Sequence, residues 1–273
     1  MKIPFKNFEL FADTTNFNPD KQTIVFLHGF TGSSEDWSEI IPQIDSNFSS
    51  ITVDLIGHGK SDSPADTALY EIDSIIQQLK SIIEKLALNK IILCGYSMGG
   101  RVALSFANKH PQLINGLILE SSTAGIKNEK ERLARIRSDE QLSERIIRFG
   151  IEDFMDYWLR LPIFESQKKL PEQRRNEIRT KKLKNNSAGL ANSLLGFSAG
   201  KMPPLWKRLN NFFFPVLLIT GEFDKKYCEL NNEMNKLLPN SHHLIVDGAG
   251  HNIHLEKPSE FVIFVNRFLS ANF

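Results

Sequence analysis

Three side chains in this sequence are of the types that act together as a nucleophile, a base and an orienting acid. Ser97 lies in a G-x-S-x-G motif, Gly95-Tyr-Ser-Met-Gly99, which follows an apolar run and precedes a helix-like stretch. A sharp strand-to-helix turn would hold this serine above a sheet, at a helix N-terminus that favours negative charge. The motif therefore predicts a serine nucleophile; the alternative is a glycine-rich turn with an incidental serine.

A serine hydroxyl needs a base, and the base needs an acid that orients it. At this kind of turn the chain order is serine, acid, histidine. His251 closes a glycine-rich D-G-A-G-H loop, and His254 is the alternative base. Asp224 follows an apolar run between Ser97 and His251, with Glu222 as the alternative acid. We predict a triad of Ser97, Asp224 and His251.

Such a serine also needs backbone N–H groups that bind developing negative charge. We expect one from Met98, directly after the nucleophile, and a second from Phe30 in the loop His28-Gly-Phe-Thr-Gly32. The sequence has no metal-ligand cluster, no phosphate-binding loop and no G-x-G-x-x-G motif after the first strand. It therefore predicts neither a cofactor nor a metal.

Short apolar runs recur along the chain with helix-like stretches between them. Runs with little polar alternation suit strands that are buried on both faces of a parallel sheet. Helices are expected from Ile72 to Leu86 and over residues 258–270, where apolar residues recur at helical spacing. The expected strands are Ile24–Leu27, Ile51–Val53, Ile91–Cys94, Gly116–Leu119, Val216–Ile219 and His243–Val246. This alternation predicts an α/β fold, a mostly parallel twisted sheet with helices on both faces.

Residues 124–204 break the alternation and read as helices and loops without clear strands. We expect a helical cap inserted over the carboxyl edge of the sheet, between core residues 1–123 and 205–273. Within this insertion, residues 127–184 carry 16 Lys and Arg against 11 Asp and Glu, a local net charge of +5. Solvated helix faces account for most of these charges, and the remainder are candidates for binding an anion.

The composition limits the classes of protein to which the chain can belong. A chain of 273 residues is long enough for one large domain with an insertion. Its net charge of +1 gives no overall attraction to nucleic acid or to a membrane. No signal-peptide pattern and no spanning apolar stretch is present. We expect a cytoplasmic monomer or homodimer without nucleic-acid or membrane partners; Cys94 and Cys228 leave a single disulfide open.

The motifs resemble the α/β-hydrolase superfamily along the whole chain. Finer features resemble one branch, the 2-succinyl-6-hydroxy-2,4-cyclohexadiene-1-carboxylate synthase (MenH) family of menaquinone biosynthesis. They are G-Y-S-M-G-G-R ending at Arg101, the stretch Glu131-Arg-Leu-Ala-Arg135 with Asp139 after it, and Trp158-Leu-Arg-Leu-Pro-Ile-Phe164. Arg179, Asn185 and the stretch Gly189-Leu-Ala-Asn-Ser-Leu194 complete the set. The resemblance implies an α/β-hydrolase fold and a lyase that eliminates pyruvate from a polycarboxylate carrying an enolpyruvyl ether. It also implies that Ser97, Asp224 and His251 are the catalytic triad.

The resemblance further implies which residues bind this small polycarboxylate. Arginine suits such a substrate because its guanidinium binds a carboxylate through two parallel hydrogen bonds. The implied carboxylate contacts are Arg101, Arg135 and Arg179, the implied pocket lining is Tyr96, Trp158 and Phe164, and Lys226 would add a positive charge. A salt bridge to a nearby acid is the alternative role for Arg101.

Other functions are compatible with the same residues, because a fold does not by itself name a reaction. A serine hydrolase, either a carboxylesterase or a C–C bond hydrolase acting on a small anionic substrate, would use the same triad. A non-catalytic ligand receptor is a third class, although an intact Ser, Asp and His set favours turnover. A dehalogenase is disfavoured because its nucleophile would be an aspartate at position 97.

Overall fold

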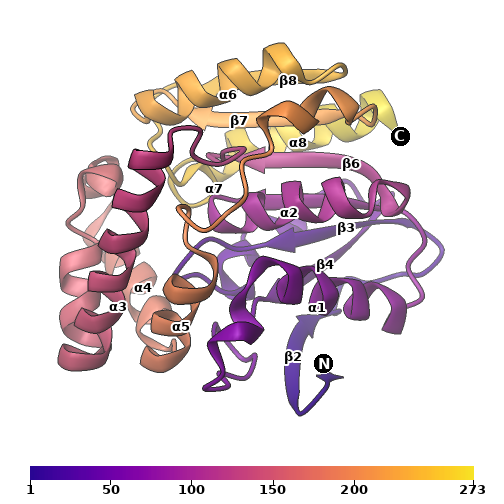
Figure 1. Ribbon diagram of the computed structural model, residues 1–273. Coiled ribbons are helices and arrows are strands. Elements are labelled where there is room, and N and C mark those ends of the chain that lie inside the picture. The colour runs from indigo at the N-terminus through magenta and orange to yellow at the C-terminus, as the bar shows by residue number, and fades with distance from the viewer.

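An eight-stranded sheet runs through the centre of the computed structural model, which describes all 273 residues (Figure 1). The strand order is β1-β2-β4-β3-β5-β6-β7-β8. Strands β3 to β8 are parallel, whereas β1 and β2 pair antiparallel at one edge. The strands are β1 Lys2–Phe5, β2 Phe8–Asp13, β3 Gln22–Leu27, β4 Phe48–Asp54, β5 Ile91–Tyr96, β6 Ile114–Glu120, β7 Val216–Gly221 and β8 Ser241–Val246.

Helices cover both faces of this sheet, because its central strands are apolar on both sides. Every residue of β5 and β7 is buried. On one face lie α1 (Ile72–Lys85), α2 (Met98–Lys109) and α6 (Lys225–Leu237), whose apolar residues join the larger core cluster. On the other lie α7 (Ile253–Glu256) and α8 (Pro258–Asn272). The predicted α/β fold is confirmed.

The chain between β6 and β7 forms helices and no strand, as the sequence predicts for residues 124–204 within this segment. Its elements are α3 (Glu129–Trp158), the 3-10 helix η5 (Pro162–Lys169), α4 (Glu172–Leu183), α5 (Ser187–Phe197) and the 3-10 helix η6 (Trp206–Asn211). The first four, which we call the cap, lie together beyond the carboxyl ends of the strands (Figure 1). The boundaries at residues 124 and 204 stay a prediction.

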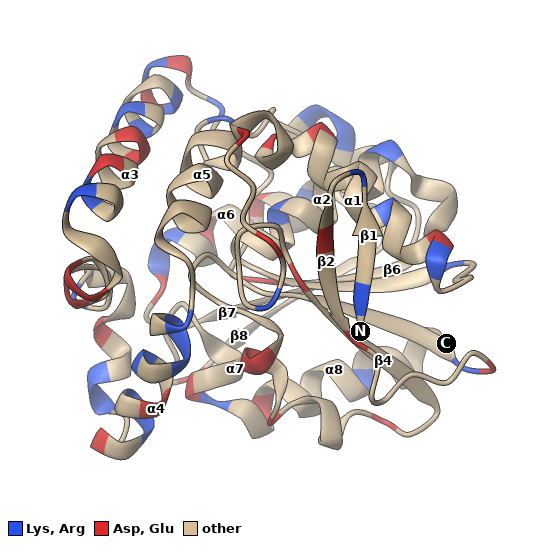
Figure 2. Ribbon diagram, turned by 90° about the horizontal axis from the view of Figure 1, so that it is seen from below, with Lys and Arg blue, Asp and Glu red and all other residues tan.

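Charge is distributed unevenly between the sheet and the cap. Lys, Arg, Asp and Glu of both signs line α3 and α4, whereas the central strands carry few (Figure 2). The short 3-10 helices are η1 (Ser34–Trp37), η2 (Ile41–Gln43), η3 (Thr67–Tyr70) and η4 (Pro111–Leu113). Both cysteines are free, so the chain has no disulfide. No helix has the length and apolar character needed to span a bilayer.

Candidate active site

Ser97 occupies a strained turn between β5 and α2. Its backbone has φ 49° and ψ −102°, a conformation that is uncommon for residues other than glycine. The turn is tight enough that a Cβ on Gly99 would lie 2.2 Å from the Leu27 carbonyl oxygen. The Ser97 N–H donates to the carbonyl oxygen of Glu120 at 2.8 Å, which ties the turn to β6. The flanking glycines are therefore required by close backbone contacts, and the turn holds the serine at the top of the sheet.

Two neighbouring strands deliver the other members of the predicted triad. Asp224 follows β7 and His251 follows β8, and both are buried. His251 Nδ1 lies 2.5 Å from Asp224 Oδ2, and its Nε2 lies 3.0 Å from Ser97 Oγ. With Nδ1–H donated to the carboxylate, the Nε2 lone pair faces the serine hydroxyl. The structure thus brings together the three residues in the geometry of a general base and its nucleophile.

The alternative base and acid have other partners. His254 is fully buried, and its Nδ1 lies 2.7 Å from Glu120 Oε2 in the core behind the nucleophile turn. Glu222 Oε2 accepts a hydrogen bond from the Gly248 N–H at 2.9 Å. Neither residue contacts Ser97, so the structure favours His251 and Asp224.

The two residues predicted to supply amide donors line the same cavity as the serine. The N–H groups of Phe30 and Met98 have no hydrogen-bond acceptor within the chain, which leaves both free for a ligand oxygen. The Phe30 loop is fixed on its core side by His28, whose Nδ1–H donates to the Gly29 carbonyl at 2.7 Å and whose Nε2 accepts from the Leu55 N–H at 3.0 Å. Burial lowers the pKa of His28, so this histidine stays neutral and keeps both bonds.

A cavity of about 290 Å³ lies between the triad and the cap. Its walls include the predicted residues Phe30, Tyr96, Met98, Arg101, Arg135, Trp158 and Phe164, together with Ser97 and His251. The Trp158 ring lies 5.3 Å from that of Phe30, and the Phe164 ring lies 6.2 Å from that of His251. One side of the cavity is therefore aromatic and comes largely from the cap.

Arg101 is the cation nearest in sequence to the nucleophile, and it is only 8% exposed. Its guanidinium donates to the Phe197 carbonyl at 3.2 Å and stacks on the Phe197 ring, 4.6 Å from the centroid. It forms no ion pair with any acid. Burial lowers the pKa of Arg101 to about 10, so it remains a cation at neutral pH. A buried cation without an acidic partner carries a large desolvation penalty, which an anionic ligand would offset.

Arg135 reaches the same cavity from α3. Its Nε donates to Asp139 Oδ2 at 2.7 Å, one helical turn away. Asp139 is 1% exposed, and its Oδ1 has no partner. The pair orients the guanidinium and leaves the terminal nitrogens of Arg135 available to a carboxylate.

The structure does not place Arg179 or Lys226 in this cavity, so the expectation for these two residues needs correction. Arg179, on α4, donates to Asp156 Oδ1 of α3 at 2.9 and 3.2 Å and does not line the cavity. Lys226 is exposed on α6. Arg179 is held away from the cavity by its ion pair with Asp156 of α3.

Other residues of the cavity wall were not found from the sequence. Tyr227, on the first turn of α6, packs its ring 4.6 Å from that of His251. Ser193 and Phe197 come from α5. Only the position of Tyr227, three residues after the acid, could have indicated its role. No cluster of three side chains suited to a metal is present.

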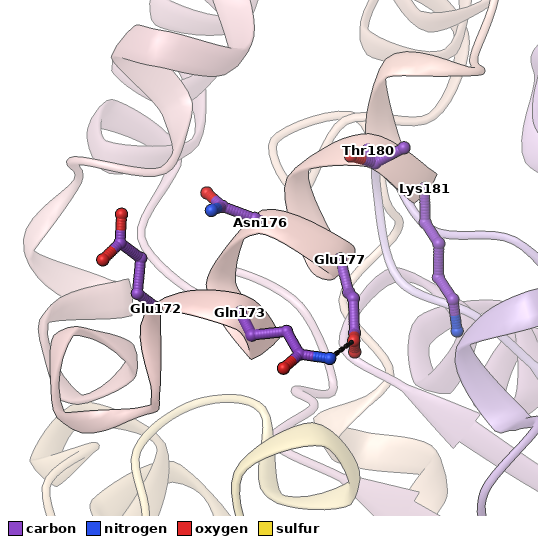
Figure 3. Close-up of a pocket in the computed structure, with 6 residues that line it drawn as sticks. All are labelled: Glu172, Gln173, Asn176, Glu177, Thr180 and Lys181. Atoms are coloured by element: carbon purple, nitrogen blue, oxygen red, sulfur yellow. Dashed lines mark hydrogen bonds between the residues drawn. The ribbon is translucent and has the colours of Figure 1, made fainter.

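A second depression, on the exposed face of α4, is separate from the active site (Figure 3). It is lined by polar residues of a single helix, including Glu172 and Lys181, and by no residue of the triad cavity. Figure 3 shows these side chains spread along the helix rather than converging on one point. We therefore assign the ligand site to the cavity at Ser97.

Strand order, the turn at Ser97 and the contacts of His251 together define a serine-triad protein of the α/β-hydrolase class. A profile of the α/β-hydrolase fold family matches residues 22–258, and the chain belongs to this family. Within it, the chain belongs with the 2-succinyl-6-hydroxy-2,4-cyclohexadiene-1-carboxylate synthases, as comparison with individual proteins shows.

Three relatives support this placement. A Bacillus subtilis protein provisionally assigned as this synthase is 44% identical, over 92% of this chain and 91% of its own. The synthase of Citrobacter koseri is 34% identical, over 92% and 95% of the two chains. Among solved structures, MenH from S. aureus superposes with a TM-score of 0.90 at 35% identity, over 98% of this chain and 99% of its own.

Proposed function

We propose that this chain is a lyase that converts 2-succinyl-5-enolpyruvyl-6-hydroxy-3-cyclohexene-1-carboxylate to 2-succinyl-6-hydroxy-2,4-cyclohexadiene-1-carboxylate and pyruvate. The observation that carries the proposal is Arg101, a buried guanidinium with no acidic partner in the cavity of Ser97. Water or a neutral ester would leave its charge uncompensated, whereas a substrate carboxylate would bind it directly. Arg135 supplies a second cation for a substrate with several carboxylates.

In this proposal the triad acts as a base. Asp224 orients His251, and His251 draws the proton from Ser97. The Ser97–His251 pair then removes the ring proton alpha to the succinyl carbonyl. The Phe30 and Met98 amides hold the enolate oxygen that forms. The enolate then re-forms the succinyl carbonyl and makes a new ring double bond at C2=C3, the existing C3=C4 double bond shifts to C4=C5, and the bond from C5 to the enolpyruvyl oxygen breaks. The released enolpyruvate takes up a proton and becomes pyruvate, so no acyl-enzyme is needed.

The remaining roles follow from the cavity walls. Arg101 and Arg135 bind carboxylates, and Tyr96, Trp158 and Phe164 enclose the ring. No cofactor takes part in the proposed steps. The cytoplasmic location, the oligomeric state and the absence of nucleic-acid and membrane partners stay predictions.

The first test supplies the substrate freshly from coupled upstream enzymes and follows pyruvate release. We expect fast release by the wild type and a loss of several orders of magnitude in kcat for Ser97→Ala, because the base then has no hydroxyl to act through. Lys226→Ala is the control variant, because it removes an exposed cation outside the cavity and should leave release unchanged. Release no faster than the spontaneous rate by the wild type would contradict the proposal.

A serine hydrolase of small anionic esters is the second candidate, and the in-line contacts of Ser97, His251 and Asp224 support it. A thermophilic esterase from Thermogutta terrifontis, solved with malate bound, superposes with a TM-score of 0.85 at 25% identity over 99% of this chain and 98% of its own. A hydrolase should cleave p-nitrophenyl acetate with a burst of one nitrophenol per serine. A dedicated lyase should cleave it slowly.

A further inference from the structure

The backbone of Thr31 is strained. It directly follows Phe30, whose amide is one of the two proposed oxyanion donors, and it is fully buried. Its φ is 66°, in the left-handed region that a β-branched side chain strongly disfavours. Strain of this kind persists only where the surrounding structure holds it. The groups that hold Thr31 therefore decide where the neighbouring Phe30 amide points.

Two residues of the cap segment make those contacts. Lys182, in the last turn of α4, donates from Nζ to Thr31 Oγ1 at 3.2 Å. Asn185 donates from Nδ2 to the Thr31 carbonyl at 2.9 Å, and its Oδ1 accepts from the Gly59 N–H at 2.9 Å. Both side chains are buried, at 5% and 6% exposure. Thr31 is thus fixed from the cap side through its side chain and its carbonyl, while His28 fixes the same loop from the core side.

Burying the Lys182 ammonium group beside a threonine hydroxyl carries a desolvation penalty. Burial lowers the pKa of this ammonium group, and the nearby Asp36 carboxylate acts in the opposite direction. The Lys182 ammonium group forms no ion pair within 4.0 Å, and its contact with Thr31 Oγ1 is the one hydrogen bond that it donates. A residue that served only to attach the cap would lie more cheaply at the surface, where charged side chains remain hydrated.

The cap has such surface attachments nearby. Lys184 Nζ lies 2.9 Å from Glu35 Oε2, Lys181 donates to the Glu35 carbonyl at 3.0 Å, and Arg174 pairs with Glu39. None of these three contacts touches Thr31. They join α4 to the same region of the core, so attachment of the cap does not require the buried pair.

We propose that Lys182 and Asn185 are positioning residues, which hold Thr31 in its left-handed conformation and so aim the Phe30 amide at the oxyanion. The inference rests on the proposed function for the role of that amide. It makes one half of the oxyanion site dependent on the cap: a displaced cap would release Thr31 and with it the Phe30 donor. The other donor, Met98, belongs to the rigid turn at Ser97 and would remain.

The test uses the rate of Ser97 labelling by a fluorophosphonate to report on the oxyanion donors, without the physiological substrate. A fluorophosphonate reacts with the serine: a Ser97 Oγ–P bond forms, the P–F bond breaks, fluoride leaves and His251 accepts the serine proton. The phosphoryl oxygen occupies the oxyanion site, so the second-order rate constant of labelling reports on its donors. We expect Asn185→Ala and Lys182→Met each to slow labelling by about 10-fold or more. Lys184→Met, which removes a neighbouring cap contact, should stay within about twofold of wild type.

A glycine at position 31 separates positioning from general loosening of the cap. Glycine adopts positive φ without strain, so Thr31→Gly should need the two cap residues less. We expect Asn185→Ala to slow labelling by less than about threefold in the Thr31→Gly background. Thermal unfolding confirms that each variant is folded, and Asn185→Ser replaces Asn185→Ala if the latter is not.

The possible results differ clearly. Slower labelling that the Thr31→Gly background rescues supports the inference. Labelling of both cap variants at the wild-type rate overturns it, and so does an equal slowing in the two backgrounds, which would mean that the residues only stabilise the cap. Because the probe is not the substrate, a wild type that labels rapidly but releases no pyruvate would contradict the proposed function and leave this test valid.

Discussion

At the scale of single residues, the triad and Arg101 differ in their effect on the stability of the unliganded protein. The triad is held by ordinary hydrogen bonds, with His251 between Asp224 and Ser97. Arg101 is different, because a buried cation without an acid costs stability in the unliganded protein. Sites that bind ligands tightly often contain such groups, which are stabilised only when the ligand is present.

This cost leads to a prediction for Arg101→Met. The methionine keeps the length and most of the apolar contact with Phe197 but removes the buried charge. We expect the free energy of unfolding to rise by about 1 kcal/mol or more, as when buried charges are replaced by apolar side chains. At the same time kcat/KM for pyruvate release should fall by at least about 100-fold, as a charge-assisted bidentate contact is lost.

Urea unfolding and pyruvate release, measured on the same preparations, check both halves. Lys184→Met is the control, because its charge is exposed and it should change neither quantity appreciably. A variant that was both less stable and inactive would show that Arg101 is mainly structural.

His58 gives the clearest pH dependence. Burial lowers its folded-state pKa from 6.5 to about 3. Between these values the unfolded chain takes up a proton that the folded chain does not, so stability is full above about pH 6.5 and falls as the pH is lowered toward 3. We expect His58→Asn to reduce the slope of unfolding free energy against pH by up to about 1.4 kcal/mol per pH unit.

The measurement is urea unfolding between about pH 4.5 and 7. Asparagine can still donate to the Ile56 carbonyl, which His58 Nδ1 contacts at 3.1 Å. His242→Asn, at an exposed position, is the matched control. An unchanged slope in His58→Asn would mean that His58 does not titrate differently in the two states.

Sequence reasoning correctly predicted that Ser97, His251 and Asp224 lie in mutual contact, whereas their catalytic roles stay a prediction. Ser97 was found through its turn, and His251 and Asp224 through chain order and glycine-rich context. Arg179 was placed wrongly, because its expected role depended on which side of α4 faces the cavity, and α4 is charged on several sides. Lys182 was missed for the same reason, because a buried lysine in a basic helix has no sequence signal of its own. Asn185 belongs to the features that carry the family resemblance, but its contact with Thr31 was not predicted.

At the scale of elements, the turn at Ser97 and the bend in α3 show two different reasons for glycine. A Cβ on Gly99 would meet the Leu27 and His28 carbonyl oxygens at 2.2 and 2.6 Å. Gly150 has φ 82° inside α3, and a Cβ there would meet nothing within 4 Å. The first glycine is required by space and the second by backbone conformation.

We therefore expect Gly99→Ala to be far more damaging than Gly150→Ala. Gly99→Ala should lower the free energy of unfolding by about 3 kcal/mol or more, because β3 and the Phe30 loop must move. Gly150→Ala should cost about 1 kcal/mol, the strain of a positive φ, and should leave the triad intact. Urea unfolding compares the two, and similar losses for both variants would contradict the distinction.

The expected elements were found where a run of apolar residues identifies them. All six expected strands formed, as β3 to β8, and the structure mainly extends their ends. The antiparallel pair β1 and β2 was not predicted, because short edge strands with polar residues on alternate positions carry a weak signal. Helix α6 was missed because few of its residues are buried: Asn231 and Met234 alone are fully so.

At the scale of the whole molecule, a net charge near zero is the sum of a positive cap segment and a negative remainder of the chain. The net charge is +1, yet residues 127–184 carry +5, which leaves −4 on the rest of the chain. These charges lie along α3 and α4 (Figure 2), and α3 contributes Arg135 to the wall of the cavity that holds Arg101. A polyanionic substrate would therefore be attracted toward the correct face of a nearly neutral protein.

This division predicts a salt dependence of a particular form. Raising NaCl from about 0.02 M to about 0.5 M shortens the screening length severalfold and weakens attraction by the exposed cap. Contacts with buried Arg101 are screened much less, so kcat/KM for the polycarboxylate should fall severalfold while kcat stays nearly constant. Neutral p-nitrophenyl acetate is the control substrate, and its slow hydrolysis should not follow the same trend. Equal salt effects on kcat and kcat/KM would instead indicate that salt acts inside the cavity, on the bound state rather than on the approach.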